Sequence, residues 1–305
     1  MQTIMSKLSV LIHTKNVADT VEKTLKSVSF ADEIVVVDME SSDETLQIAK
    51  KYHAKIYQHE DLGYADPARN FAIAKASHQW ILVVDADEVI SSALREIILQ
   101  TINDSNSADI YHLPRKNFVF GKWIMKTGWW PDYQPRLFKK GTVSWQVGVH
   151  RLPDMTGIQE KFPAEEKYAI EHANYTDITH FLAKLNHYTS IQAKERLAVA
   201  SKNNFSTDEM FEIFANEFAK RSLMMNGFEE GLHGSSLSFL QAMYEAIIYL
   251  KQWGATGFNQ TKPEDLTKTL TKVQRIWRYW WADYQVRHAT GLVKIYWQFR
   301  RKLKV

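Results

Sequence analysis

Continuously apolar segments alternate with segments of helical spacing over roughly the first hundred residues, and this alternation limits the fold more than any other feature. Strands that are apolar at consecutive positions are buried on both faces, as in a parallel sheet covered by helices. The predicted strands cover 8–12, 34–37, 55–57 and 80–84. The predicted helices cover 17–28, 43–51 with Ser42 as its N-cap, and 68–76. The sequence therefore predicts an α/β fold with a mostly parallel sheet.

Polar residues follow three of these predicted strands. Ligands of α/β sheets bind beyond the carboxyl ends of the strands, so we expect one site along this edge. Asp85 and Asp87, spaced i and i+2 after a buried strand, can face one Mg²⁺ or Mn²⁺, since these cations prefer oxygen ligands. An acidic turn before a helix near Ser91 would show the same spacing. The three polar groups are Thr14-Lys15-Asn16, Asp38 to Asp43, and Asp85 to Glu88.

The chain lacks the glycine motifs that bind phosphate in other α/β proteins. No G-x-G-x-x-G follows the first predicted strand, and G-x-x-x-x-G-K-[ST] does not occur. A dehydrogenase and a P-loop enzyme are therefore excluded. The chain also has no cysteine, which excludes disulfides, thiolate metal sites and a cysteine nucleophile. Phosphate binding would have to depend on a metal ion and on cationic side chains.

The second half of the chain reads differently from the first. Residues 110–170 are rich in aromatic residues, Gly and Pro, which predicts strands joined by long loops of the kind that often carry function. From about residue 180 the spacing is helical. No stretch approaches the roughly 18 consecutive apolar residues of a membrane span, and no signal peptide is visible. We therefore expect a cytoplasmic protein.

The C-terminal segment is strongly basic. From Lys272 to Val305, nine Lys or Arg residues accompany one acid, Asp283. A basic, aromatic, amphipathic helix is typical of an interfacial membrane anchor, although a helix packed on the catalytic domain with a solvated basic face would look the same. No nucleic-acid recognition motif accompanies the charge, so we expect an anionic membrane surface as the partner and not nucleic acid. One helical face carries Leu292, Ile295, Tyr296, Phe299 and Leu303.

A series of motifs, in the same order and spacing, resembles the family 2 glycosyltransferases, and most closely the branch of the lipopolysaccharide-core β-1,4-glucosyltransferases. The resemblance covers about residues 6–255. It implies a GT-A nucleotide-diphospho-sugar transferase fold with a helical C-terminal region. The motifs are Ser9 to Asn16, Ala31 to Asp38, Ser42 to Thr45, Ala68 to Ala72, Val84 to Glu88, Pro114-Arg115, Gly128 to Asp132, Arg136 to Phe138, Val149-His150, and Gly227-Phe228 with Gly231 and Gly234.

The resemblance also implies a domain division and a role for each matching residue. A catalytic domain spans 6–175, with nucleotide-sugar binding in 6–115 and acceptor binding and catalysis in 116–175. The helical region 176–305 associates with membrane or pairs subunits, so a homodimer is possible. Donor-binding residues are Thr14, Lys15, Asn16, Asp38, Glu40, Asp43, Arg69, Asn70, Asp85 and Ala86. Acceptor-binding residues are Trp129, Trp130, Arg136 and Arg151, metal ligands are Asp87, Asp85 and His150, and catalytic residues are Asp132 and His150.

The function that the resemblance implies is inverting, metal-dependent transfer of a hexose, with Mn²⁺ or Mg²⁺ as cofactor. The donor would be a nucleotide-sugar such as a UDP-hexose, and the acceptor a glycan or a lipid-linked glycan in bacterial surface polysaccharide or lipooligosaccharide synthesis. The enzyme would sit peripherally on the inner face of the cell membrane. Two alternatives stay open: transfer to a polyprenyl phosphate, and a non-catalytic glycan-binding or membrane scaffold protein.

Asp132 is the first candidate for the general base that such a displacement requires. An adjacent indole, from Trp130 or Trp129, is expected to raise its pKa by desolvation. The chain departs from the resembling branch at Arg151, where that branch usually has Glu after the histidine, and at 63–67, where it usually has a Gly-rich stretch. Arg151 removes one carboxylate and adds a cation that could hold an acceptor phosphate.

Overall fold

The chain forms two compact units, and its sequence passes between them three times. The computed structural model describes residues 5–61, 63–64, 66–146, 152–199, 204–259 and 265–303. The first unit comprises Met1–Phe118 and Trp130–Asn174, and the second comprises Val119–Trp129 and Tyr175–Val305. A short segment from the middle of the sequence therefore belongs with the C-terminal helices.

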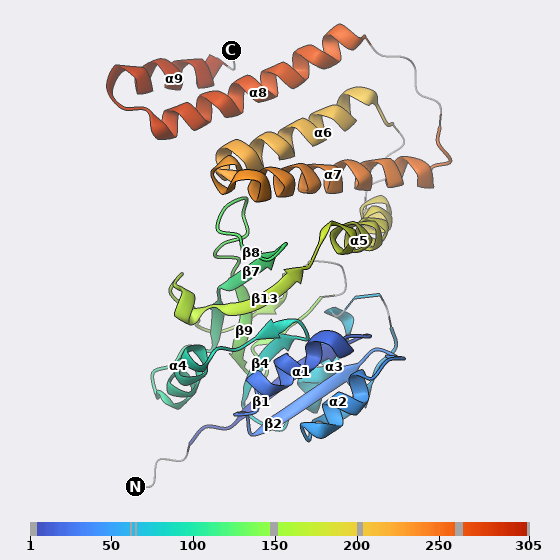
Figure 1. Cartoon of the computed structure of the whole chain (residues 1–305), viewed down its shortest axis with the longest axis vertical. Coiled ribbons are helices and arrows are strands. Elements are labelled where there is room, and N and C mark those ends of the chain that lie inside the picture. The colour runs from blue at the N-terminus through green and yellow to red at the C-terminus, as the bar shows by residue number, and fades with distance from the viewer. Residues whose placement is uncertain are drawn as a thin grey trace. The chain divides into compact units, whose positions relative to one another are not determined.

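The first unit contains the strands and helices that the alternating pattern predicts (Figure 1). The strands β7 and β13 each end one residue inside the second unit. Its strands are β1 (Leu8–Thr14), β2 (Glu33–Asp38), β3 (Lys55–Gln58), β4 (Trp80–Asp85), β5 (Glu88–Val89), β6 (Ile110–Leu113), β7 (Arg115–Val119), β9 (Gln134–Lys139), β10 (Val143–Ser144), β11 (Asp154–Met155), β12 (Gln159–Lys161) and β13 (Ile170–Tyr175). Its helices are α1 (Ala18–Ser27), α2 (Thr45–Lys51), α3 (Asp66–Lys75), α4 (Ser92–Asn103) and the short η1 (Glu166–Tyr168).

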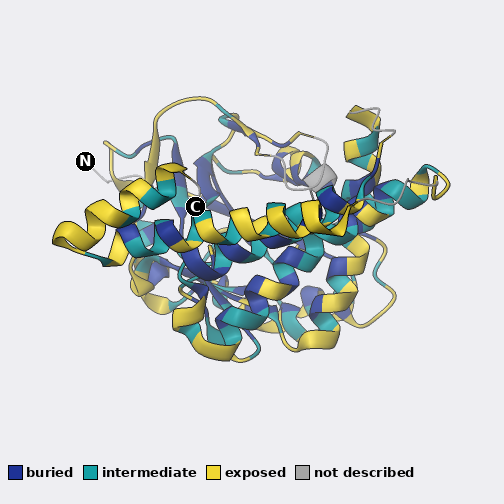
Figure 2. Cartoon of the chain, turned by 90° about the horizontal axis from the view of Figure 1, so that it is seen from above, coloured by how far each residue is buried: buried dark blue, intermediate teal, exposed yellow. Residues whose placement is uncertain are grey.

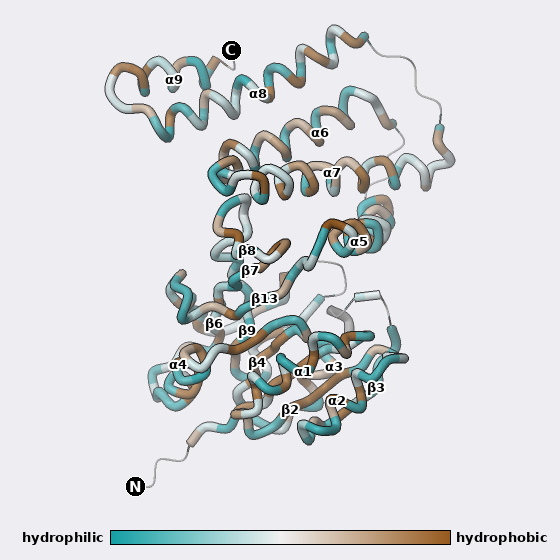
Figure 3. The backbone as a smooth tube through the Cα atoms, in the orientation of Figure 1, coloured by the Kyte–Doolittle hydropathy of each residue, from teal (hydrophilic) through white to brown (hydrophobic). Residues whose placement is uncertain are grey.

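The main sheet has the strand order β12-β6-β9-β4-β1-β2-β3. Its strands β1 to β4 run parallel, whereas β9 is antiparallel to both β4 and β6. Every residue of β1 and β2 is buried, because helices cover both faces of the sheet. Val10 and Ile12 pack toward α1, α2 and α4, and Leu11 packs toward α3. The α/β fold class is confirmed, and the apolar colouring of β1, β2 and β4 is visible in Figure 3.

The parallel register places the carboxyl ends of three strands side by side. His13 of β1 pairs with Asp85 of β4, and Thr14 of β1 pairs with Asp38 of β2. The hydroxyl of Thr14 donates to Asp38 Oδ1 over 2.8 Å, which ties the two strand ends together. The predicted gathering of polar residues along one edge of the sheet is therefore confirmed.

The predicted N-cap Ser42 is wrong. Helix α2 begins at Thr45, and the carboxylate of Asp43 accepts from its backbone N–H over 3.0 Å. The second oxygen of Asp43 accepts from the backbone N–H of Ala18 over 3.0 Å, so one side chain holds the first turns of both α1 and α2. Ser42 instead donates its backbone N–H to Asn16 over 2.7 Å. Asp43 therefore shapes the loop at the sheet edge.

The second unit is mainly helical. The 119–129 segment packs on its helices, where Val119 and Ile124 join a buried cluster with Leu237 of α7. Thr127 donates its backbone N–H to the Met225 carbonyl over 3.0 Å. Its elements are β8 (Lys122–Trp123), α5 (Ile178–Val199), α6 (Thr207–Ala219), the π-helical η2 (Lys220–Met224), η3 (Gly227–Glu230), α7 (Gly231–Ala255), α8 (Leu266–His288) and α9 (Gly291–Leu303).

Two glycines explain how closely η3 and α7 approach each other. A Cβ on Gly234 would lie 2.0 Å from the Gly227 carbonyl oxygen, and a Cβ on Gly227 would lie 2.6 Å from Ser238 Oγ. No side chain fits in either position. The two glycines therefore allow η3 to pack closely on α7 within the helical unit.

Helix α9 contributes no buried residue to the unit. Figure 2 colours it only as exposed or intermediate. Across the described ranges, no helix combines the length and the apolar composition needed to cross a membrane. The five predicted apolar residues all lie on the surface, with exposed fractions of 84% for Leu292, 60% for Ile295, 50% for Tyr296, 62% for Phe299 and 53% for Leu303.

Candidate active site

The Asp85-Ala86-Asp87 turn joins β4 to β5 and is held from two sides. Strand β4 is central in the main sheet, and β5 pairs with β13, with His172 opposite Glu88. The backbone N–H of Ala173 donates to the Asp87 carbonyl over 3.0 Å. Because both ends of the turn belong to strands, its two carboxylates are fixed at the edge where the parallel strands end.

Asp85 lies in a buried ionic cluster. Arg69 Nη2 donates to its Oδ1 over 3.0 Å, and Arg136 Nη2 donates to its Oδ2. Arg136, with 3% of its surface exposed, also contacts Glu88 Oε1 at 2.8 Å. Burial alone would raise the pKa of Asp85, but the charges of Arg136 and Arg69 outweigh it and hold that pKa well below its ordinary value. Both oxygens of Asp85 are thus committed to arginines.

Arg136 was expected to bind the acceptor. The structure places its guanidinium in the buried cluster with Asp85 and Glu88, away from solvent. The pairing between β4 and β9 brings it there, since Arg136 belongs to β9 next to the strand that ends at Asp85. Its position is that of a counter-charge for the acidic turn.

Asp87 is the second carboxylate of the turn, and 25% of its side chain is exposed, the same fraction as for Asp85. Its Oδ2 lies 3.5 Å from Nε2 of His172. A carboxylate oxygen beside an imidazole nitrogen is a donor set that suits Mn²⁺, and the carboxylate alone suits Mg²⁺. Among the described residues no group of three His, Asp or Glu side chains is gathered for a metal, so a cation here would need further ligands from a bound diphosphate or water.

Asp132 follows the Trp130-Pro131 cis peptide and lies among polar groups. Arg115 reaches its Oδ2 with Nη2 at 2.7 Å, and Asn117 Nδ2 donates to the same oxygen over 2.9 Å. Burial alone would raise the pKa of Asp132, but Arg115 and the hydrogen bonds from Asn117, Arg115 and Gln134 lower it. The expectation of a raised pKa is therefore wrong, and Asp132 is ionised at neutral pH.

The expected donor residues at the β1 and β2 ends fall into buried and exposed groups. Thr14 and Asp38 are fully buried and hydrogen-bonded to each other, so they hold the ends of β1 and β2 together. Lys15, Asn16 and Glu40 form the exposed or half-exposed rim. Lys15 Nζ donates to the Glu40 carbonyl over 2.8 Å, which holds the two loops together. These three rim residues are therefore the expected donor residues of the two strand ends whose side chains reach solvent.

The expected donor-binding residues Arg69 and Asn70 lie on α3 beside Trp145. The guanidinium of Arg69 lies 5.4 Å from the Trp145 ring centroid. Asn70 donates to the Trp145 carbonyl over 2.7 Å and accepts from its N–H over 2.9 Å. Ala86 is buried, and its carbonyl accepts from Thr24 Oγ1 over 3.0 Å. Arg69 thus contacts the acidic turn through Asp85, and Asn70 fixes the backbone of Trp145.

The remaining predicted residues are distributed between the units. Trp130 lies in the first unit, whereas Trp129 lies in the second, where its ring meets Tyr175 edge-on at 6.0 Å. His150 and Arg151 lie outside the described residues. The structure also adds residues to the site that sequence reasoning placed elsewhere or missed, namely Glu88, Arg115, Asn117 and His172. On β13 His172 shares the buried face of the strand with Ile170 and Asn174, an arrangement that the structure shows and the sequence alone did not.

The first unit, a mixed sheet flanked by helices with an acidic turn at the end of its central parallel strands, has the GT-A fold of glycosyltransferases. The sequence profile described as Glycosyl transferase family 2 matches residues 9–156. An uncharacterised glycosyltransferase of Rickettsia prowazekii is 31% identical over 248 residues, covering 74% of this chain and 80% of that protein. Another, of Rickettsia felis, is 30% identical over 236 residues, covering 74% and 83%. The chain belongs to glycosyltransferase family 2.

Two solved structures show a more distant likeness. Staphylococcus aureus TarS 1–349 in complex with UDP has a TM-score of 0.43 and 15% identity, covering 85% of this chain and 94% of that chain. Glucosyl-3-phosphoglycerate synthase of Mycobacterium tuberculosis, in complex with Mn²⁺, UDP and glucosyl-3-phosphoglycerate, has a TM-score of 0.31 and 19% identity, covering 38% and 45%. The assignment to the family depends on the sequence matches and not on these structures.

Proposed function

We propose that the protein is an inverting, metal-dependent hexosyltransferase that uses a UDP-sugar to extend a glycan or lipid-linked glycan of the bacterial cell surface. The observation that carries the proposal is the pair of carboxylates, Asp85 and Asp87, that the turn after β4 holds at the edge where β1, β2 and β4 end. Asp85 is neutralised by two arginines. Residues 6–175 would carry catalysis, and 176–305 would attach the enzyme to membrane or pair subunits.

In this proposal Asp87 would hold Mn²⁺ or Mg²⁺, which would supply positive charge against the charge that develops on the departing diphosphate. Lys15, Asn16 and Glu40 contact the nucleoside from the exposed rim of the site. Arg69 and Arg136 keep Asp85 ionised and immobile, so the turn that carries Asp87 does not move when the diphosphate arrives.

Asp132 takes the proton of the acceptor hydroxyl. Its Oδ2 is occupied by Arg115 and Asn117, whereas among the described residues Oδ1 accepts one hydrogen bond, from Gln134 over 3.1 Å. We therefore assign proton transfer to Oδ1. A carboxylate with a lowered pKa is a weak base, so the proton moves as the bond between sugar and diphosphate breaks.

The proposal is tested by titrating the full chain with UDP in a calorimeter, first with Mn²⁺ and then with EDTA. UDP is expected to bind with Mn²⁺ and at least about tenfold more weakly with EDTA, because removing the cation leaves the diphosphate facing Asp87 unscreened. GDP serves as the control for nucleotide choice. Equal affinity for UDP in Mn²⁺ and EDTA, or no binding of UDP in either, would contradict the proposal of a metal-dependent UDP-sugar site.

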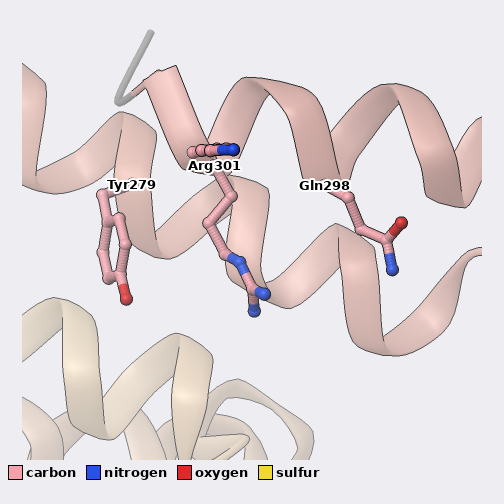
Figure 4. Close-up of a pocket in the computed structure, with 4 residues that line it drawn as sticks. Tyr279, Gln298 and Arg301 are labelled. Atoms are coloured by element: carbon pink, nitrogen blue, oxygen red, sulfur yellow. The ribbon is translucent and has the colours of Figure 1, made fainter.

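We further propose that α9 attaches the enzyme to the anionic surface of the cytoplasmic membrane. Its apolar side chains are exposed, with Leu292 at 84% and Phe299 at 62%. Lys294 and Lys302 are exposed cations on the same helix. Arg301 instead pairs with Asp283 of α8 at 2.7 Å, and Figure 4 shows it reaching between the two helices beside Tyr279. Apolar and cationic groups together fit an interface of acyl chains and anionic headgroups.

Replacing both Ile295 and Phe299 with Asp is expected to lower partitioning onto phosphatidylglycerol vesicles by at least about 100-fold, since each apolar side chain contributes roughly 2 kcal/mol when buried. The measurement is co-sedimentation of the full chain. Leu232→Asp is the matched control, because Leu232 is 82% exposed on α7 of the same unit. Unchanged partitioning of the double variant contradicts membrane attachment. If the wild type does not bind vesicles but forms dimers as its concentration rises, the exposed apolar face of α9 is instead covered by a second copy of the chain.

A further inference from the structure

A polar cavity lies between the last two helices of the chain, α8 and α9. Its volume is about 600 Å³, and it is lined by Tyr279 of α8 and by Gln298, Arg301 and Lys302 of α9. Figure 4 shows the hydroxyl of Tyr279, the guanidinium of Arg301 and the amide of Gln298 directed to the same side of these helices. The lining thus offers two cations and two neutral hydrogen-bond donors, and none of its four residues is an acid.

The guanidinium of Arg301 is used on one side only. Its Nη1 donates to Asp283 Oδ1 over 2.7 Å, and Arg287 Nε donates to the other oxygen of Asp283 over 3.2 Å. Within the described part of the chain, Nε and Nη2 of Arg301 meet no hydrogen-bond acceptor. Two adjacent N–H groups of this kind form a fork that binds two oxygens of one phosphate. Arg301 can therefore hold a phosphate without giving up its contact with α8.

Lys302 supplies the second positive charge of the lining. It is exposed, and it lies one turn after Gln298 on the same face of α9. Asp283 is the only acid in the sequence of α8 and α9, and Arg287 already balances its charge. Arg301 and Lys302 therefore leave the cavity with a net positive charge.

The apolar face of α9 adjoins this cavity. Ile295, Phe299 and Lys302 follow one another at i, i+4 and i+7, which places them along one side of the helix. Both apolar side chains are exposed. A phosphate in the cavity therefore has an apolar surface beside it that acyl chains can cover, whereas a free phosphate has nothing to bury there. The combination favours the phosphate of a lipid.

We infer that the cavity between α8 and α9 binds the phosphate of one anionic phospholipid, with Arg301 as its bidentate partner and Lys302 as the second charge. Tyr279 and Gln298 donate to the remaining phosphate oxygens. The inference rests on the proposed attachment of α9 to membrane. It goes further, because it gives the helix a site for a single headgroup in addition to a general attraction to negative charge.

The test is calorimetric titration of the full chain with dihexanoyl phosphatidylglycerol below its micellar concentration, because single lipid molecules present no charged surface. The wild type is expected to bind one lipid per chain, at least about tenfold more tightly than it binds inorganic phosphate. Arg301→Lys keeps the charge but loses the fork, so it should weaken lipid binding about tenfold. Lys302→Gln should weaken it about fivefold.

The matched controls are Arg278→Lys and Lys268→Gln. Both residues are exposed on α8, and neither lines the cavity, so the two variants should bind the lipid as the wild type does. Equal affinity of Arg301→Lys and Arg278→Lys overturns the inference. Should Arg301→Lys release α9 from α8, the comparison of Lys302→Gln with Lys268→Gln decides, because Lys302 takes no part in the pair with Asp283.

The source of the phosphate is decided by the same titration. Inorganic phosphate that binds as tightly as the lipid overturns the assignment to a phospholipid. The inference and the proposed attachment also fail in distinguishable ways. Wild-type protein that co-sediments with phosphatidylglycerol vesicles but binds no single lipid overturns only this inference, whereas wild-type protein that does neither overturns both.

Discussion

Asp87→Asn is expected to lower the rate of sugar transfer by about 10³-fold, the size of effect seen when a group that stabilises transition-state charge is removed. The amide retains the shape of the side chain but loses the charge that holds the cation. Because Asp87 is partly exposed and asparagine keeps the shape of the side chain, the free energy of unfolding should stay within about 0.5 kcal/mol of the wild type. The measurement is turnover of UDP-sugar in Mn²⁺, together with urea unfolding.

The matched control for this substitution is Glu96→Gln. Glu96 is an exposed carboxylate on α4 that pairs weakly with Arg95 at 3.6 Å, so the same change of acid to amide occurs away from the site. Its turnover should equal that of the wild type. Turnover of Asp87→Asn within tenfold of the wild type would show that the carboxylate does not hold a cation needed for transfer.

Arg136→Met should destabilise the protein by about 3–5 kcal/mol, because it leaves Glu88 and Asp85 without their shared buried counter-charge. Urea unfolding measures this loss. Arg95→Met is the matched control, since its surface pair should contribute less than about 1 kcal/mol. If Arg136 bound the acceptor instead, the substitution would raise KM for the acceptor and leave stability near that of Arg95→Met, so the two roles give opposite results.

The same cluster predicts how stability depends on pH. Arg136 and Arg69 hold the pKa of Asp85 below its ordinary value, although burial opposes them. A carboxyl group with a lowered folded-state pKa stabilises the fold above its unfolded pKa, and this stabilisation is lost as pH falls toward the folded value. Without Arg136 the desolvation of Asp85 is offset less fully, since Arg69 remains but one of the two paired charges is lost, and the folded-state pKa of Asp85 rises. The variant should therefore begin to lose stability at a higher pH than the wild type does.

The strands of the parallel core were predictable because burial on both faces leaves a local signal. The run 80–84 predicts β4 to within one residue, and 34–37 does the same for β2 at both ends. Strand β9 was not predicted to enter the main sheet between β4 and β6. Its pairing joins segments more than fifty residues apart, and nothing in the spacing of either segment specifies the other.

Contacts between segments distant in the sequence were equally unpredictable in the site. Asp85 and Asp87 were predicted because the turn and its strand are contiguous, but their partners come from distant segments. Arg136 looked like an acceptor residue in sequence, and only its pairing beside β4 makes it a counter-charge. For Asp132 the adjacent tryptophans suggested desolvation, whereas Arg115, seventeen residues earlier, decides the direction of its pKa shift.

The three passages of the chain between its units restrict how this enzyme can be rearranged by recombination. The 119–129 segment is bonded to Met225 and, through Lys122, to Glu230 at 2.6 Å, so it evolves under the constraints of the helices although it interrupts the α/β sequence. A crossover near residue 175 that imported a relative's C-terminal half would leave this segment facing unmatched partners. Exchange of the helical unit between relatives therefore requires that residues 119–129 and 175–305 be replaced together. We expect this unit to diverge by point substitution more readily than by exchange of whole domains.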